Sequence, residues 1–206
     1  MIGYYNYTVI LTYLSLASSV TGICLAMSGH PLGAIWALLF SGLCDMFDGR
    51  VARMKKDRTV NECKFGIQID SLCDVIAFGV LPAAIGYSVG MTRIYLLPIL
   101  ILFVLCAVIR LAYFNVTEEE RQITDSGKRL FYEGLPVTSS AVIIPFAYCM
   151  KAISDKILLP IFAITMLTVA ILYVSPIKVP KPGKYISALL LALGMAEFIC
   201  LLVLSF

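Results

Sequence analysis

Long apolar stretches, separated by short polar breaks, run along almost the whole chain. Seven of them approach the length of about 20 residues that crosses a membrane as a helix. They cover roughly residues 8–28, 32–53, 64–90, 93–116, 134–151, 157–175 and 184–205. Inside a bilayer every backbone polar group needs a partner within the protein, and a helix provides one within a single segment. The pattern predicts an all-α integral membrane protein, a polytopic helical bundle.

Composition agrees with this class. Hydrophobic residues make up 60% of the chain and charged residues 14%, and the mean hydropathy is +0.93, whereas soluble domains carry about 25% charged residues. We interpret residues 1–206 as a single membrane-embedded domain, since nothing in the sequence indicates a separate soluble part. There is no basic stripe with interleaved aromatic residues, so we expect no nucleic-acid partner.

The distribution of lysine and arginine predicts the orientation in the membrane. Most of these residues fall in three breaks, at 50–64, 117–133 and 176–184. Cytoplasmic loops are the ones enriched in lysine and arginine. We therefore expect a cell-membrane protein whose 50–64 hairpin faces the cytoplasm.

Four aspartates lie near the ends of two consecutive predicted spans, on the basic side. Asp45 and Asp48 are three residues apart, and Asp70 and Asp74 are four apart, so each pair shares one face of its helix. Charged side chains in a span cost about 2.5–3.5 kcal/mol each on insertion scales and are usually functional. A divalent cation would offset the repulsion among four carboxylates, and oxygen-only ligands suit Mg²⁺ or Mn²⁺.

Small residues accompany the aspartates. Gly49 and Ala52 share the face of Asp45 and Asp48, Gly66 shares the face of Asp70 and Asp74, and Arg53 follows at once. Small residues leave room for a phosphate group, and arginine suits an anionic oxygen. The arrangement predicts a binding site for a lipid-linked diphosphate. The alternative is that the aspartates only form structural salt bridges with Arg50, Arg53 and Lys64.

These residues form the pattern Asp45-x2-Asp48-Gly49-x2-Ala52-Arg53, then Gly66-x3-Asp70-x3-Asp74. The pattern resembles the signature of the CDP-alcohol phosphatidyltransferases. Twelve residues separate Arg53 from Gly66, against about eight in the family. The additional residues fall in the polar segment KKDRTVNEC, which we expect to be a hairpin loop where insertions cost little. In the first span, Ser15 stands where the family often has asparagine.

The resemblance implies a six-helix core, here with an additional C-terminal span, in a homodimer with its active site at the cytoplasmic face. It implies two divalent metal ions per site, bound by Asp45, Asp48 and Asp70. Asp74 would be the general base, with a metal contact of its own. Gly49, Ala52, Arg53 and Gly66 would bind the CDP-lipid.

Three further runs resemble the phosphatidylserine synthase branch: Asp70 to Ala83, Arg110 to Asn115, and Phe131 to Pro136. Val75 stands where the branch that uses glycerol phosphate typically has lysine. The resemblance implies that CDP-diacylglycerol and L-serine react to give phosphatidylserine and CMP among the membrane lipids. Another acceptor, glycerol 3-phosphate or an inositol phosphate, is the alternative within the family.

Charge chemistry suggests how serine would bind. Arg110 suits its carboxylate and Glu133 its ammonium group. Alternatively, Arg110 extends to the membrane surface or binds the lipid phosphate, and Glu133 pairs with Lys128 or Arg129. A transporter is the rival class, but transporter sites favour the bilayer midplane and repeated halves. Here the acids cluster toward the basic side, and no internal repeat is visible.

Overall fold

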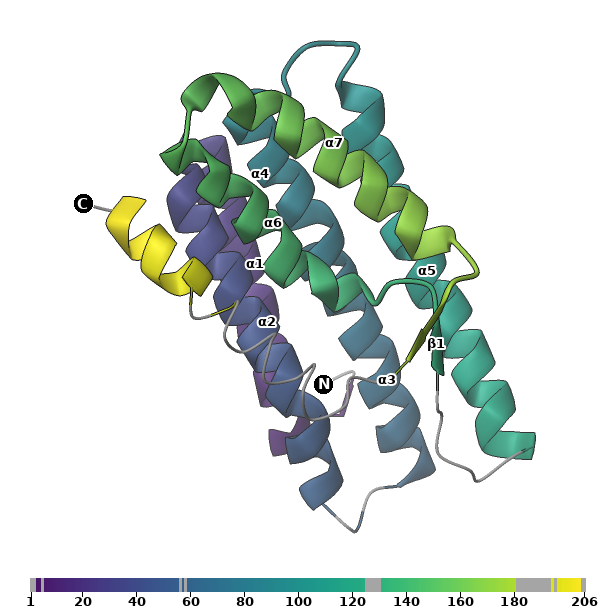
Figure 1. Cartoon of the computed structure of the whole chain (residues 1–206). Coiled ribbons are helices and arrows are strands. Elements are labelled where there is room, and N and C mark those ends of the chain that lie inside the picture. Colours follow the sequence, from purple (N-terminus) through teal and green to yellow (C-terminus); the bar gives the residue numbers. More distant parts are fainter. Residues whose placement is uncertain are drawn as a thin grey trace.

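The computed structural model of the chain describes residues 3, 4, 6–55, 57, 59–124, 131–180, 194 and 196–204. Within its helices and strands, the side chains of residues 53, 120–124, 131–133 and 178–180 lie outside this description. The described part is a bundle of helices with one small two-stranded sheet (Figure 1). Its elements are η1 (Tyr7–Val9), α1 (Ile10–Met27), α2 (Pro31–Met54), α3 (Val60–Asp74), η2 (Val75–Val80), α4 (Leu81–Val89), α5 (Leu97–Thr124), β1 (Phe131–Glu133), η3 (Val137–Ser139), α6 (Ser140–Cys149), η4 (Met150–Ala152), α7 (Asp155–Val174) and β2 (Lys178–Pro180).

Most of the predicted spans are confirmed. Five helical segments are long and apolar enough to cross a membrane: Tyr7–Met27, Pro31–Ala52, Val60–Val89, Leu97–Glu119 and Asp155–Val174. The stretch predicted at 134–151 is a shorter apolar helix, Val137–Ala152. Within the stretch predicted at 184–205, the structure describes residues 194 and 196–204, and these are helical. The chain is a multi-pass helical membrane protein.

Small and hydroxyl-bearing side chains bring α1 and α2 close together. Ser41 Oγ donates a hydrogen bond to the Ser15 carbonyl at 3.1 Å, and Ser19 Oγ lies 2.9 Å from Ser41 Oγ. A Cβ atom on Gly22 would come within 2.8 Å of the Ala37 Cβ, so the two backbones approach as closely as small residues permit. Ser15 is therefore buried in the contact between these helices.

The third span contains a π-helical segment, η2, which joins α3 to α4 and begins directly after Asp74. Pro82 has no N–H group, so the carbonyl of Phe78, four residues earlier, lacks its usual α-helical donor. Ser140 Oγ on α6 donates to that carbonyl at 3.2 Å. Segments of this kind occur frequently at functional sites. The hydrogen bond anchors α6 to the span that carries two of the aspartates.

The polar segment after the fourth span differs from the prediction. The apolar stretch was expected to end at residue 116 with a loop to follow, whereas α5 continues to Thr124. Glutamate, arginine and glutamine are good helix formers, so the helix extends beyond the apolar stretch.

A short antiparallel sheet, which the sequence pattern did not predict, joins two of the basic segments. In it β1 pairs with β2, and Tyr132 lies opposite Val179. The pairing brings the 117–133 and 176–184 segments together on one side of the bundle, as the charge pattern predicts. The sheet lies toward the end at which the chain passes from α2 to α3 (Figure 1).

Candidate metal and substrate site

Four aspartates from two helices converge at this end of the bundle. Asp45 and Asp48 belong to α2, and Asp70 and Asp74 to α3. One carboxylate oxygen from each of Asp45, Asp70 and Asp74 lies within 4.8 Å of the other two. Asp48 lies one turn after Asp45 on the same face of α2 and adds a fourth carboxylate beside these three. The structure thus brings together the acidic residues that the sequence pattern singles out.

The cluster is buried deeply enough that its charges need compensation. Asp48 and Asp74 are each 9% exposed, and neighbouring buried carboxylates repel one another. Among the side chains that the structure describes, no lysine or arginine forms an ion pair with any of the four aspartates. Arg50 instead lies over the Phe47 ring, 5.6 Å from its centroid. The salt-bridge alternative therefore has no support within the described residues.

The donor set has the chemistry that a divalent metal ion requires. Carboxylate oxygens are hard ligands, and an oxygen-only site suits Mg²⁺ or Mn²⁺ better than the softer metals. Carboxylates that approach from two helices can bind one ion jointly and so offset their mutual repulsion. The cluster of Asp45, Asp70 and Asp74, with Asp48 beside it, is therefore fitted to a divalent cation.

Small residues extend the site from the carboxylates toward the end of the bundle. Gly49 and Ala52 follow along α2, and Gly66 precedes Asp70 by one turn of α3. All three are partly exposed. Residues spaced by four share a helix face, so Gly66 lies on the face of the α3 aspartates. Arg53 belongs to α2, but its side chain lies outside the described residues, and its contact with an anionic oxygen stays a prediction.

The connection from α2 to α3 is shorter than predicted. The segment KKDRTVNEC was expected to form a loop, but α3 already begins at Val60. Thr59 and Glu62 form a capping box, in which each side chain accepts a hydrogen bond from the backbone N–H of the other residue. A threonine followed three residues later by a glutamate is the sequence signal for this start, and hydropathy alone misses it because the first turn is polar.

A hydrogen-bonded pair that the sequence did not predict connects α3 to α5 beside the cluster. Asn115 Nδ2 lies 2.8 Å from Ser71 Oγ and donates to it, and Asn115 Oδ1 lies 3.1 Å from the same hydroxyl. Ser71 directly follows Asp70. Polar side chains that pair across membrane helices stabilise their association. An asparagine at the end of an apolar stretch is a signal that could have indicated such a contact.

Arg110 lies inside the bundle rather than at its surface. Its side chain is 6% exposed, its Nε donates to the Leu135 carbonyl at 3.3 Å, and its guanidinium lies 5.6 Å from the centroid of the Phe114 ring. A side chain that extends to the membrane surface would keep its charged group in water. The burial therefore contradicts that alternative, while binding to serine or to the lipid phosphate stays a prediction.

The segment beside Arg110 is closely packed. Gly134 adopts φ +73°, and a Cβ there would come within 2.8 Å of the Tyr173 carbonyl oxygen and 3.4 Å of Arg110 Nε. Glycine adopts this conformation without steric cost. Glu133 lies opposite Lys178 in the sheet. Its side chain, like Lys128 and Arg129, lies outside the described residues, so the prediction that it binds an ammonium group also stays open.

Fold and site together define a multi-pass membrane protein with a carboxylate-rich site fitted to a divalent metal ion. Comparison with protein families identifies it further. The CDP-alcohol phosphatidyltransferase family matches residues 5–196, and the chain belongs to this family. The match includes both aspartate-bearing helices and the small residues beside them.

Individual relatives are named as serine-dependent enzymes. CDP-diacylglycerol–serine O-phosphatidyltransferase of Saccharomyces cerevisiae is 41% identical over 113 residues, which are 53% of this chain and 40% of that protein. Archaetidylserine synthase of Methanothermobacter thermautotrophicus is 35% identical over 174 residues, 84% of this chain and 68% of that protein. CDP-diacylglycerol–serine O-phosphatidyltransferase of Helicobacter pylori is 34% identical over 145 residues, 68% and 56% respectively. The chain thus matches only part of the length of these relatives.

Proposed function

We propose that the chain transfers the phosphatidyl group of CDP-diacylglycerol to the hydroxyl group of L-serine, giving phosphatidylserine and CMP. The observation that carries the proposal is the convergence of carboxylates from α2 and α3, with oxygens of three of them within 4.8 Å, at the residues of the family pattern. The names of the yeast and Helicobacter relatives support serine as the acceptor.

The proposed roles divide the site between its two helices. Asp45, Asp48 and Asp70, with a further contact from Asp74, would hold two divalent ions, Mg²⁺ or Mn²⁺. Such ions neutralise negative charge on the diphosphate and on the departing CMP. Gly49, Ala52 and Gly66 let the CDP group lie close to the backbone. Arg53 pairs with one of its anionic oxygens.

Asp74 is proposed to accept the proton of the serine hydroxyl. A bond forms between the serine oxygen and the phosphorus of the phosphatidyl group, the bond from that phosphorus to CMP breaks, and the hydroxyl proton passes to the Asp74 carboxylate. A general base must lie within hydrogen-bonding reach of the proton that it accepts. The side chain is 9% exposed and lies among the other carboxylates, which supports this role.

The acceptor is proposed to be held by charge. Arg110 would bind the serine carboxylate, and Glu133 the ammonium group. The burial of Arg110 supports its part, because a buried guanidinium needs polar or anionic partners and a substrate carboxylate adds one. Val75, the first residue of η2, offers no positive charge for a second phosphate group, which favours serine over glycerol 3-phosphate.

CMP release tests the reaction. Purified protein is supplied with Mn²⁺ or Mg²⁺, CDP-diacylglycerol, and serine, glycerol 3-phosphate or an inositol phosphate in turn. Release with serine alone is expected. No release with any alcohol would exclude the transferase, and release only with another alcohol would exclude serine. A parallel reaction with a CDP-activated archaeal lipid tests the donor that the Methanothermobacter relative's name suggests.

We also propose that the site faces the cytoplasm, because most lysines and arginines lie on its side. In a cysteine-free variant, Asp57→Cys should react with an impermeant maleimide only in inside-out vesicles. Thr92→Cys, in the exposed turn after α4, should react only in right-side-out vesicles. The reverse pattern would overturn the orientation.

A homodimer is proposed as well, and chemical cross-linking in native membranes tests it.

A further inference from the structure

One face of each aspartate-bearing helix continues beyond the metal cluster toward the end of the bundle. On α3, Glu62, Gly66, Asp70 and Asp74 follow one another at intervals of four residues. On the α2 side, Asp48 and Ala52 are followed by Lys55, the residue that caps the helix end. Residues three or four apart share a helix face. On each helix, therefore, the aspartates are followed toward the hairpin by a small residue and then by a charged residue.

The two terminal charges meet across the helices. Lys55 Nζ lies 2.9 Å from Glu62 Oε1, and the side chains are 25% and 16% exposed. This is the one salt bridge found among the described residues. It joins α2 to α3 closer to the hairpin than the aspartate cluster does, so Ala52 and Gly66 lie between the cluster and the salt bridge.

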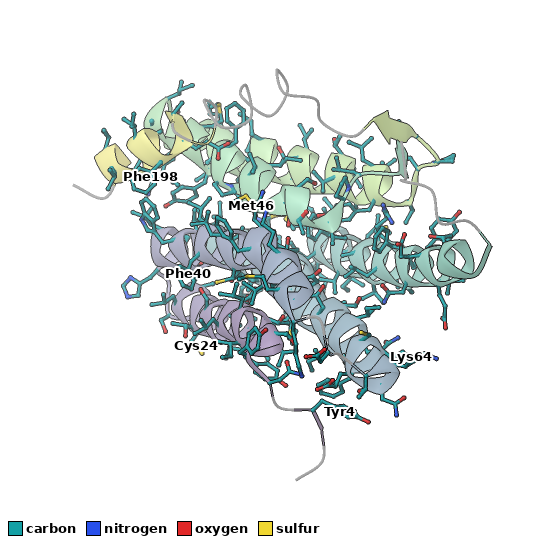
Figure 2. The ribbon with its side chains drawn as sticks, turned by 90° about the horizontal axis from the view of Figure 1, so that it is seen from below. Tyr4, Cys24, Phe40, Met46, Lys64 and Phe198 are labelled. Atoms are coloured by element: carbon teal, nitrogen blue, oxygen red, sulfur yellow. The ribbon has the colours of Figure 1, made fainter. Side chains whose placement is uncertain are left out.

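Glu62 is fixed in place by more than the lysine. Its Oε1 also accepts a hydrogen bond from Asn6 Nδ2 at 3.1 Å, and its Oε2 accepts one from the Thr59 backbone N–H at 2.8 Å. Beside it, the Tyr4 and Phe65 rings pack edge to face, with centroids 5.6 Å apart. Tyr4 and Lys64 lie at this same end of α3 in Figure 2. An isolated surface ion pair contributes little, but this carboxylate is held from three segments of the chain.

The spacing matches the dimensions of the proposed substrate. An α-helix rises 1.5 Å per residue, so Glu62 lies about 12 Å from Asp70 along α3, and Lys55 about 10 Å from Asp48 along α2. The small residues Gly49 and Ala52 on α2 and Gly66 on α3 lie in the intervening part of these two faces. A nucleoside with its first phosphate is of comparable length. A diphosphate at the carboxylates would therefore place the cytidine base near Lys55 and Glu62.

We propose that Lys55 and Glu62 form the end wall of the CDP site and are positioning residues for the nucleoside. The inference rests on the proposed function, and it adds two residues that lie outside the family pattern, in the segment that is longer here than usual. Lys55 presents N–H donors and Glu62 presents acceptor oxygens, the groups that the polar edge of cytosine and the ribose hydroxyls can bind. Neither side chain contacts the reacting phosphorus.

The test compares a ligand that reaches the end wall with one that does not. Binding of CDP and of inorganic pyrophosphate is measured by calorimetry on the full-length protein in nanodiscs with Mn²⁺. The variants are Lys55→Met and Glu62→Gln. Lys64→Met is the matched control, because Lys64 is exposed on the same helix. We expect both end-wall variants to weaken CDP binding roughly tenfold, the effect of losing one charge-assisted hydrogen bond, with pyrophosphate binding unchanged.

Equal weakening of CDP and pyrophosphate binding would overturn the proposal, since it would indicate general distortion of the hairpin. Unchanged CDP binding in both variants would overturn it as well. Lys55→Met carries the test alone if Glu62→Gln does not fold, because Lys55 is not part of the capping box. In turnover assays, the KM for CDP-diacylglycerol should rise while the KM for serine stays constant.

The same measurements separate this inference from the proposed function. Wild-type protein that binds CDP but releases no CMP with any alcohol would exclude the transferase, and the comparison of CDP with pyrophosphate would still decide the role of the end wall. Wild-type protein that binds pyrophosphate but not CDP would overturn both proposals.

Discussion

Asn115 on α5 holds Ser71 on α3 through the amide and hydroxyl groups of the two side chains, at 2.8 Å and 3.1 Å. Ser71 is the neighbour of Asp70, so the contact fixes the rotation of α3 where it presents its carboxylates. Polar pairs of this kind between membrane helices contribute modestly to stability, so their effect on geometry is the more important one.

Replacing Asn115 by leucine should therefore reduce both stability and turnover. We expect a loss of about 1 kcal/mol in the free energy of unfolding, measured by denaturant titration in mixed micelles, and a lower kcat. Thr117→Val is the control, since the Thr117 hydroxyl donates to the Tyr113 carbonyl within α5. If both variants lost the same turnover, the contact between the helices would have no particular role.

Asp74→Asn should separate substrate binding from chemistry. The amide cannot accept the serine proton, so we expect CMP release to fall by a factor of about 10²–10⁴, the usual contribution of general acid–base catalysis. Binding of CDP should change only slightly. Stopped-flow or radiometric CMP release, with calorimetry for CDP, measures the two effects. Turnover close to that of the wild type would refute the assignment of the base.

Removing divalent metal should destabilise the folded protein. At a hundredfold excess over its dissociation constant, a ligand that binds only the folded state stabilises it by about 2.7 kcal/mol. Thermal unfolding after chelation, and after addition of Mg²⁺ or Mn²⁺, should show a matching shift in Tm. Asp45→Asn should reduce that shift because it removes one member of the closely spaced carboxylate set. An identical Tm with and without metal would contradict the metal site.

Arg110→Ala should affect serine more than the lipid donor. Loss of the guanidinium removes the proposed partner of the serine carboxylate, and we expect the KM for serine to rise by at least tenfold. The KM for CDP-diacylglycerol should change much less. Arg93→Ala, an exposed arginine that hydrogen-bonds to Tyr95, is the control. Equal increases in both KM values would contradict the assignment.

Hydropathy and charge spacing predicted the parts of the molecule that depend on the membrane. Five of the seven predicted apolar stretches are membrane-length helices, and the spacing of Asp45, Asp48, Asp70 and Asp74 predicted which faces would meet. Two of the three basic segments meet in the small sheet, as the charge pattern predicts. These features can be predicted because the free energy of placing apolar or charged side chains in the membrane shapes the sequence along the whole length of each helix.

Other features depend on local chemistry that hydropathy does not measure. The ends of α5 and α3 were misplaced because Thr124 and Val60 lie in polar but helix-forming segments. The three-residue strands carry too little pattern to be recognised. The contact between Ser71 and Asn115 depends on how two helices are rotated against each other, and no spacing within one segment reveals that rotation.

The π-helical segment after Asp74 also affects how the protein can be altered. A π turn contains more residues than an α turn, so the side chains of α4 are rotated about the helix axis relative to those of α3. In α4, Leu81 and Ile85 are fully buried inside the bundle, whereas α3 carries the aspartates. The direction in which the aspartates face, relative to the buried residues of α4, therefore depends on the length of η2, so an insertion or deletion in this segment should disturb the site more than a substitution.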